Sequence, residues 1–156
     1  MLDRAGLMRD SSGDDLDYGA LEEATGFHLR LAQVGMFAAF HEDMAEHGFS
    51  PAETSALILV GANPGIRHGR LAEALCIRLA HMSKLLQRFE AAGLVERRRP
   101  EGDRRALALH LTAEGESRVA ALLPDLAAHD ARQTATLTPA ERAEFLRLLR
   151  KYAAQG

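Results

Sequence analysis

Two short helical patterns followed by two extended ones, within residues 68–111, constrain the fold more than any other feature of this chain. Residues 68–75 and residues 79–92 each repeat apolar side chains at three- or four-residue spacing, which predicts two amphipathic helices. The three residues 76–78 form a short break, and Gly93 ends the second helix. Because so short a break forces the two helices to pack together, the second helix must bury one face and expose the other.

The segment after Gly93 is typical of a β-hairpin. Residues 94–99 are strand-like, residues 100–103 contain the Pro and Gly of a turn, and residues 105–111 place a Leu at every second position. Helix, break, helix and hairpin is the order of a winged helix-turn-helix, in which the hairpin is called the wing.

The flanking segments are predicted to be helical. Residues 18–47 contain no Pro and carry apolar residues at helical spacing, which predicts one long amphipathic helix ended by Gly48. Ser50 and Thr138 each precede Pro-Ala-Glu, a capping box that starts a helix. A further long helix is expected over residues 113–135. The expected fold class is mainly α with a small β-hairpin wing.

The composition narrows the class of protein. The chain has 156 residues, of which 47% are hydrophobic and only 5% aromatic, so Leu and Ala provide most of its core. A single Cys excludes a disulfide framework within the chain and a Cys-based zinc finger. The longest apolar run is too short to span a bilayer, and charges interrupt the apolar residues at the start. We therefore expect a cytoplasmic protein.

The charge is unevenly distributed. Residues 66–105 contain ten basic and five acidic side chains, a formal charge of +5. The rest of the chain holds nine basic and seventeen acidic side chains, a formal charge of −8, which leaves a net charge of −3. A positive middle between negative ends is expected when one module binds phosphate and the remainder stays soluble.

The second helix and the hairpin offer the side chains that DNA recognition needs. Small side chains let a helix approach the floor of the major groove, Lys and Arg bind guanine or phosphate, and Arg suits the narrow minor groove. We expect His81, Ser83 and Lys84 to contact bases, and Arg67, His68 and Arg88 to contact phosphates. The remaining candidates are Arg78, Ala80, Arg97, Arg98, Arg99, Arg104 and Arg105, with Arg104 or Arg105 in the minor groove.

Residues 50–115 resemble the MarR family of bacterial transcription regulators. The matching stretches are SPAETSALILV and GRLAEALCIRLAHMSKLLQRFEAAGLVERRRPEGDRRALALHLTAEG. They contain the Leu-Ala-Glu-x-Leu helix of the family, the Glu-x-x-Gly-Leu-Val helix end, the Asp-x-Arg wing and the Leu-Thr-x-x-Gly that follows. Three positions depart from the family pattern: Cys76 replaces a usual Gly, Arg78 replaces the capping Ser or Thr, and Leu79 stands where Pro is frequent. The departures leave open where the second helix begins and which side chains contact bases.

The resemblance extends over about residues 20–153, because members dimerise through their first and last helices. It implies a dimerisation helix over 18–48, a DNA-binding domain over 50–111 and C-terminal dimerisation helices over 112–156. Residues 1–17 are polar, acidic and contain Gly and Ser, which predicts a disordered acidic tail. In the family the Asp-x-Arg pair, here Asp103 and Arg105, braces the wing and presents its Arg to DNA.

The function that the resemblance implies is a homodimeric, ligand-responsive repressor. Its partners would be double-stranded operator DNA, a second copy of the chain, and a small aromatic or phenolic effector or its CoA thioester. The protein would be associated with the nucleoid when bound to its operator. Candidate effector-binding residues lie on the first helix: Arg30, Phe37, Phe40, His41 and Met44.

Other functions remain as alternatives. A winged helix can serve as a protein-interaction module, which would favour an apolar patch on the second helix. Cys76 could act as a redox switch, although a small buried residue suits the turn better. A metal-responsive regulator of the same family is a further alternative, although the His and acidic residues near His41 lack a His-x-x-x-His pair, so we expect no metal. No catalytic motif is recognisable, so neither an enzyme nor a cofactor is expected.

Overall fold

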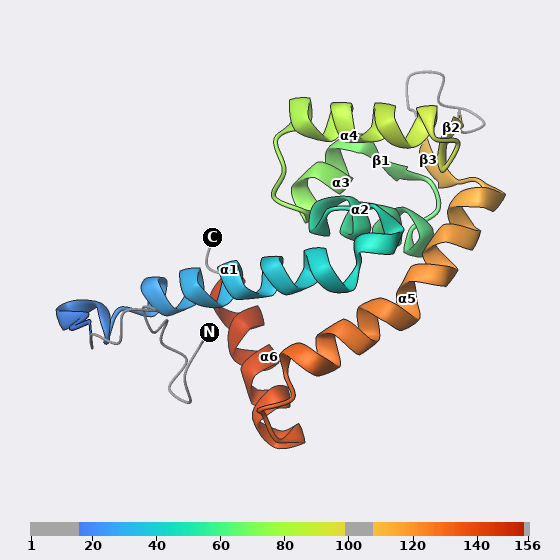
Figure 1. Ribbon diagram of the computed structural model, residues 1–156. Coiled ribbons are helices and arrows are strands. Elements are labelled where there is room, and N and C mark those ends of the chain that lie inside the picture. The colour runs from blue at the N-terminus through green and yellow to red at the C-terminus, as the bar shows by residue number, and fades with distance from the viewer. Residues whose placement is uncertain (1–15, 99–107, 155–156) are drawn as a thin grey trace. The chain divides into compact units, whose positions relative to one another are not determined.

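The structure, a computed structural model, describes residues 16–98 and 108–154 (Figure 1). The chain divides into two compact units, residues 1–36 and residues 37–156. The fold is mainly helical with one small antiparallel sheet, which confirms the predicted fold class. The described elements are η1 (Gly19–Leu21), α1 (Thr25–Asp43), η2 (Ala45–His47), α2 (Pro51–Ala62), β1 (Ile66–Arg67), α3 (His68–Ala74), α4 (Leu79–Ala91), β2 (Val95–Arg98), β3 (Ala108–Leu111), α5 (Ala113–Gln133) and α6 (Pro139–Ala153).

The helix predicted over residues 18–47 is shorter than expected. The 3-10 turn η1 precedes it, and α1 occupies only Thr25–Asp43. Gly19 has a φ of +52°, which interrupts a right-handed helix. At the other end Met44 leaves the helical conformation and is 1% exposed in the core, and Gly48 then turns the chain at a φ of +70°. The predicted helix was therefore too long at both ends, because the backbone leaves the right-handed helical conformation at Gly19 and at Met44.

Both predicted capping boxes are present. At the start of α2, Ser50 Oγ accepts a hydrogen bond from the Glu53 N–H, and the Glu53 carboxylate accepts one from the Ser50 N–H at 2.9 Å. Thr138 and Glu141 make the same pair of bonds at the start of α6. The bonds from Thr138 also hold the pKa of Glu141 below its usual range. Each box therefore satisfies backbone groups that a helix start leaves unpaired.

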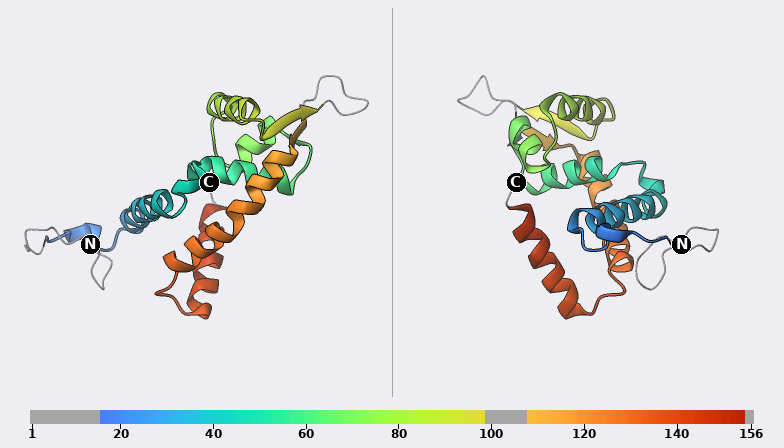
Figure 2. Two further views of the ribbon diagram at one scale, coloured as in Figure 1. Left: turned by 45° about the vertical axis from the view of Figure 1, so that its right-hand side comes forward. Right: turned by 90° about the vertical axis from the view of Figure 1, so that its left-hand side faces the viewer.

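The winged lobe, which we define as α2, β1, α3, α4, β2 and β3, encloses one apolar core. Helix α4 lies along the outer side of this lobe in the three ribbon views (Figures 1 and 2). The buried members of the core come from all three helices and from the sheet: Ala56, Leu57, Val60, Leu71, Ala72, Met82, Leu85, Leu86, Phe89, Leu94, Val95 and Leu109.

The sheet contains a strand that the sequence did not predict. Its order is β1-β3-β2, with both pairings antiparallel, so β3 lies in the centre. Ile66 pairs with Leu109, and Val95 pairs with Leu111. Strand β1 has only two residues, too few to show an alternating apolar pattern in the sequence. Its partner strand lies more than forty positions away along the chain. Strand β3 of the wing is thus hydrogen-bonded on both sides, to β1 and to β2.

Helix α5 begins against the end of the wing. Thr112 caps it by accepting a hydrogen bond from the Gly115 N–H at 3.0 Å, and the Thr112 hydroxyl donates to the Gly93 carbonyl at 2.6 Å. A Cβ on Gly115 would lie 2.0 Å from the Leu94 carbonyl oxygen, so only glycine permits this approach. The start of α5 is therefore fixed to the end of α4.

Candidate nucleic-acid interface

Helices α3 and α4 form the predicted helix-turn-helix. Leu71 and Ala72 of α3 are buried, and the Ile77 N–H donates to the Ala72 carbonyl at 2.9 Å, which closes the turn. Cys76 adopts a φ of +52° in this turn, in the left-handed region that favours glycine. Cys76 is also exposed, so the expectation of a buried small residue was wrong. The left-handed backbone, and not burial of the side chain, is therefore the reason that a Gly suits this position.

The second helix of the pair has one buried and one exposed face. Met82, Leu85, Leu86 and Phe89 are buried. The helix begins directly after Arg78, whose backbone is extended and whose side chain makes no cap. The unusual residue at that position therefore does not shift the start of α4. The side chains that α4 and its cap turn to solvent include four candidates for DNA contact: Arg78, Ala80, His81 and Lys84.

The side chain of Ser83 has fewer free hydrogen-bonding groups for DNA than the other candidates on α4. Its hydroxyl donates to the Leu79 carbonyl at 2.9 Å, and its Oγ lies 3.5 Å from Nε2 of His68 on α3. The oxygen of Ser83 retains a lone pair that can accept a hydrogen bond. The two candidates Ser83 and His68 are thus brought together. No local sequence pattern predicts this contact, because fifteen positions separate the two residues.

Arg88 forms an ion pair within the lobe. Its guanidinium binds the Oε1 of Glu53, whose side chain is 8% exposed, while 72% of the Arg88 side chain remains exposed. The other oxygen of Glu53 accepts hydrogen bonds from Ser50. Sequence analysis recognised Glu53 only as a capping residue. No local signal reveals its second partner, which lies 35 positions away on α4.

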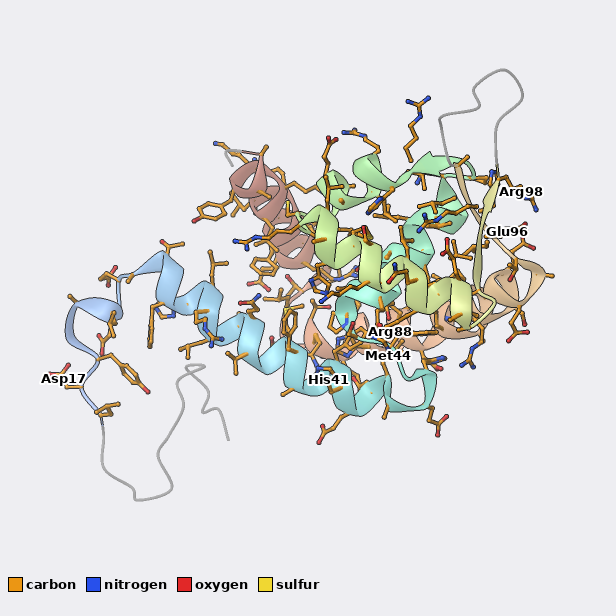
Figure 3. All side chains as sticks on the ribbon, turned by 90° about the horizontal axis from the view of Figure 1, so that it is seen from above. Asp17, His41, Met44, Arg88, Glu96 and Arg98 are labelled. Carbon is orange, nitrogen blue, oxygen red and sulfur yellow. The ribbon has the colours of Figure 1, made fainter. Side chains whose placement is uncertain are left out.

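The wing carries two of the candidate arginines in the described residues. Arg97 pairs with Glu90 of α4, and the Arg98 guanidinium donates to Glu96 of the same strand (Figure 3). Arg67 is exposed at the end of β1. Four further candidates, Arg99, Asp103, Arg104 and Arg105, lie outside the described residues.

The pattern of ion pairs distinguishes two kinds of basic residue in the lobe. Arg70, Arg88, Arg97 and Arg98 each bind an acidic side chain. Within the part of the chain that the structure describes, no ion pair or side-chain hydrogen bond involves Arg78, His81 or Lys84. The positive charge at the start of α4 is therefore available to an external anion.

The effector candidates fall into two groups. Phe40 and Met44 are buried in a second core cluster with Leu122 of α5, whereas Phe37 and His41 are exposed. Arg30 is also exposed and belongs to the first unit. Figure 3 shows His41 and Met44 near the C-terminal end of α1.

A polar cluster around the buried His129 lies beside the second core, and no sequence pattern predicts it. The His129 Nδ1–H donates to Asp43 Oδ2 at 2.7 Å, and Arg132 binds Asp43 Oδ1 at 3.0 Å. These two partners hold the pKa of Asp43 below its usual range. His47 makes a similar bond to Asp125 at 2.9 Å. The end of α1 is thereby tied to α5 through polar groups that no sequence spacing connects.

Two further observations concern other classes of site. Among the described residues, no group of three or more His, Cys, Asp and Glu side chains is placed to hold a metal ion. Among the described helices, none is both long enough and apolar enough to cross a membrane.

Comparison with known proteins gives a consistent result. A model of the MarR family matches residues 49–107. Transcriptional regulator HosA of Escherichia coli is 35% identical over 92 residues, which cover 59% of this chain and 68% of HosA. The transcriptional repressor CouR bound to a 23-mer DNA duplex has a TM-score of 0.85 at 33% identity, over 90% of this chain and 99% of CouR. CouR bound to p-coumaroyl-CoA has a TM-score of 0.79 at 31% identity, over 89% of this chain and 98% of CouR.

The exposed polar face of α4, the buried face behind it and the adjoining three-stranded sheet define a winged helix-turn-helix transcriptional regulator. The overlap with HosA and with CouR then shows the family: the chain belongs to the MarR family.

Proposed function

We propose that this chain is a homodimeric, ligand-responsive repressor that binds operator DNA through α4 and the wing. The observation that carries the proposal is the exposed start of α4. There the side chains of Arg78, His81 and Lys84 make no hydrogen bond or ion pair with another described residue. An α-helix fits the major groove, and basic side chains at its start can bind guanine and phosphate. The similarity to CouR in its DNA-bound state supports this use of the lobe.

The candidate side chains take different roles in this proposal. His81, Ser83 and Lys84 contact base edges, with Ser83 acting through its oxygen because its proton is used within α4. Arg67 and His68 contact phosphates. Arg88 keeps unused N–H donors for a phosphate while Glu53 fixes its position. By the family resemblance, the proposal extends to Arg99, Asp103, Arg104 and Arg105 of the wing.

The homodimer is supported by apolar side chains that this single chain leaves exposed. On α6, Phe145, Leu146, Leu148 and Tyr152 are exposed, with Tyr152 at 57%. An apolar surface of this kind on one helix is typical of an interaction site. A second copy that covers α6 would bury it, and two-fold symmetry would place two α4 helices in successive major grooves.

The effector is proposed to be a small aromatic acid or its CoA thioester. CouR is similar over 98% of its length and was solved with p-coumaroyl-CoA. In this chain Phe37 and His41 offer an aromatic and a polar contact on the exposed side of α1. Asp43, two positions after His41, is bound to His129 and Arg132 of α5. A ligand that moves the end of α1 would therefore act on α5 and on the position of the lobe, to the extent that it binds the two states differently.

The alternative of a protein-interaction module is less well supported. It would favour an apolar patch on α4, but the exposed face of α4 is polar or small apart from Leu79. A redox response through the exposed Cys76 remains a separate alternative for regulation. That alternative would be favoured if oxidation abolished DNA binding by the wild type while Cys76→Ser still bound DNA after the same treatment.

The test of the proposal begins with selection of DNA duplexes from a random library by the purified chain. We expect an enriched pseudo-palindromic sequence, two chains per duplex by light scattering, and affinity that falls steeply with added salt. Addition of aromatic acids and their CoA thioesters should then release the DNA for at least one compound. The absence of any enriched sequence at low salt would contradict the DNA-binding proposal, and one chain per duplex would contradict the dimer.

A further inference from the structure

We infer that Leu79 is a specificity-determining residue that recognises the 5-methyl group of thymine in the operator. The inference rests on the proposed function, because it assumes that α4 enters the major groove of DNA. Leu79 is apolar, unlike the polar and basic residues of α4 to which the proposed function assigns DNA contacts.

Leu79 stands out by its exposure. It is 59% exposed, and it is the one exposed large apolar side chain among the described residues between Phe37 and Leu123. The other large apolar side chains of α4, Met82, Leu85, Leu86 and Phe89, are all buried. The lobe thus buries its apolar residues efficiently and leaves a single Leu in solvent. One exposed Leu is too small a surface to hold a protein partner.

The position of Leu79 places it at the leading end of α4. It is the first residue of the helix, directly after the extended Arg78. Side chains in a helix tilt toward its N-terminus, so the Leu79 side chain extends beyond the first turn. The next residue, Ala80, is small and exposed. Leu79 is therefore positioned to reach the floor of a groove before the rest of the helix does.

The polar neighbour of Leu79 cannot donate a hydrogen bond to a base at this point. Ser83, one turn along the helix, gives its proton to the carbonyl of Leu79 at 2.9 Å. No donor of Ser83 is left for a base. The surface at this end of α4 is thus apolar at Leu79 and positively charged on either side, at Arg78 and Lys84.

This combination matches one chemical group of DNA. The edges of the base pairs in the major groove present donors, acceptors and a single apolar group, the 5-methyl of thymine. The adjacent Arg78 fits a phosphate that borders the groove, while Lys84 reaches a base edge as proposed above. Thymine is therefore the base expected opposite Leu79 in each half-site.

The experiment uses a duplex that the wild-type chain selects from a random library, with each thymine replaced in turn by deoxyuridine, which removes only the methyl group. At one symmetric pair of positions we expect the wild type to bind about fourfold more weakly for one substituted half-site and about fifteenfold for both. Leu79→Ala should bind the thymine and deoxyuridine duplexes equally. Leu79→Met, which keeps a long apolar side chain at this position, should still bind the thymine duplex more tightly. Circular dichroism of each variant verifies that α4 is formed.

The outcomes separate the two levels of the proposal. If selection enriches no sequence, the proposed DNA-binding function fails. If a sequence is enriched but no deoxyuridine weakens binding, or if Leu79→Ala keeps the discrimination against deoxyuridine, the assignment of Leu79 is overturned while DNA binding stands. A uniform loss of affinity in Leu79→Ala, with the discrimination unchanged, would overturn the assignment in the same way.

Discussion

Glu53 and Arg88 tie the start of α2 to the exposed helix of the lobe. One oxygen of the Glu53 carboxylate caps α2 through Ser50, and the other binds the Arg88 guanidinium on α4. A single buried carboxylate thus orients α4 relative to the helix beneath it. The same contact limits the positions that Arg88 can take against a phosphate.

This link should be measurable as an energetic coupling. We expect Glu53→Ala to lower the free energy of unfolding by about 1–2 kcal/mol, because it removes the cap and the ion pair together. Arg88→Ala should cost about 1 kcal/mol or less, because most of its side chain is in solvent. Urea unfolding of both single variants and the double variant at one protein concentration gives the coupling. Strictly additive effects would show that the ion pair contributes nothing.

Cys76 offers a substitution that should stabilise the fold. A non-glycine residue in the left-handed region costs about 1–2 kcal/mol, while glycine adds about 0.4–1 kcal/mol of entropy to the unfolded chain. At a φ of +52°, we expect Cys76→Gly to raise the free energy of unfolding by about 0.5–1 kcal/mol. Cys76→Ala keeps the strain and should be nearly neutral. A destabilised Cys76→Gly variant would mean that the turn is not left-handed at this residue.

Two helical glycines should respond to alanine in opposite ways. Gly115→Ala should cost more than about 3 kcal/mol, because its Cβ would lie 2.0 Å from the Leu94 carbonyl oxygen. Gly69 in α3 has open space around its Cα, so Gly69→Ala should be neutral or stabilise by up to about 1 kcal/mol. Thermal unfolding of the two variants checks both values. Equal effects would contradict the close contact between the start of α5 and Leu94.

The Asp43 cluster predicts how stability depends on pH. Hydrogen bonds from His129 and Arg132 lower the pKa of Asp43 in the folded state, so its ionised form stabilises the fold. That contribution is fully present above the unfolded pKa of about 3.9 and is lost as the pH falls through the lower folded pKa. We therefore expect the stability gap between the wild type and Asp43→Asn to be largest near neutral pH and to narrow below about pH 4. Urea unfolding at pH 7 and pH 3 measures the gap, and a gap that widens in acid would contradict this prediction.

The sequence predicts the elements whose signals are local. The capping boxes at Ser50 and Thr138, the stop at Gly93 and the buried face of α4 all depend on residues within one or two turns of each other. The resemblance over residues 50–115 likewise predicts the family.

Features that depend on distant partners were missed or misjudged. Strand β1 is defined by its pairing with β3, and Met44, just after the end of α1, lies in a core cluster with Phe40 and Leu122. The partners of Arg88 and Asp43 are likewise remote, at Glu53 and at His129. Spacing within a segment carries no information about such contacts, so the polar links of the site required the structure.

The two lysines of the chain provide the most direct test of DNA binding by the exposed face of α4. Lys84 lies on α4 and Lys151 on α6, and both are exposed. Fluorescence anisotropy with a selected duplex should show that Lys84→Ala binds at least about fivefold more weakly, because a base or phosphate contact is lost. Lys151→Ala, with the same change in charge, should bind like the wild type. If the two variants bind equally, whether both match the wild type or both are weakened alike, α4 is not the DNA-binding surface.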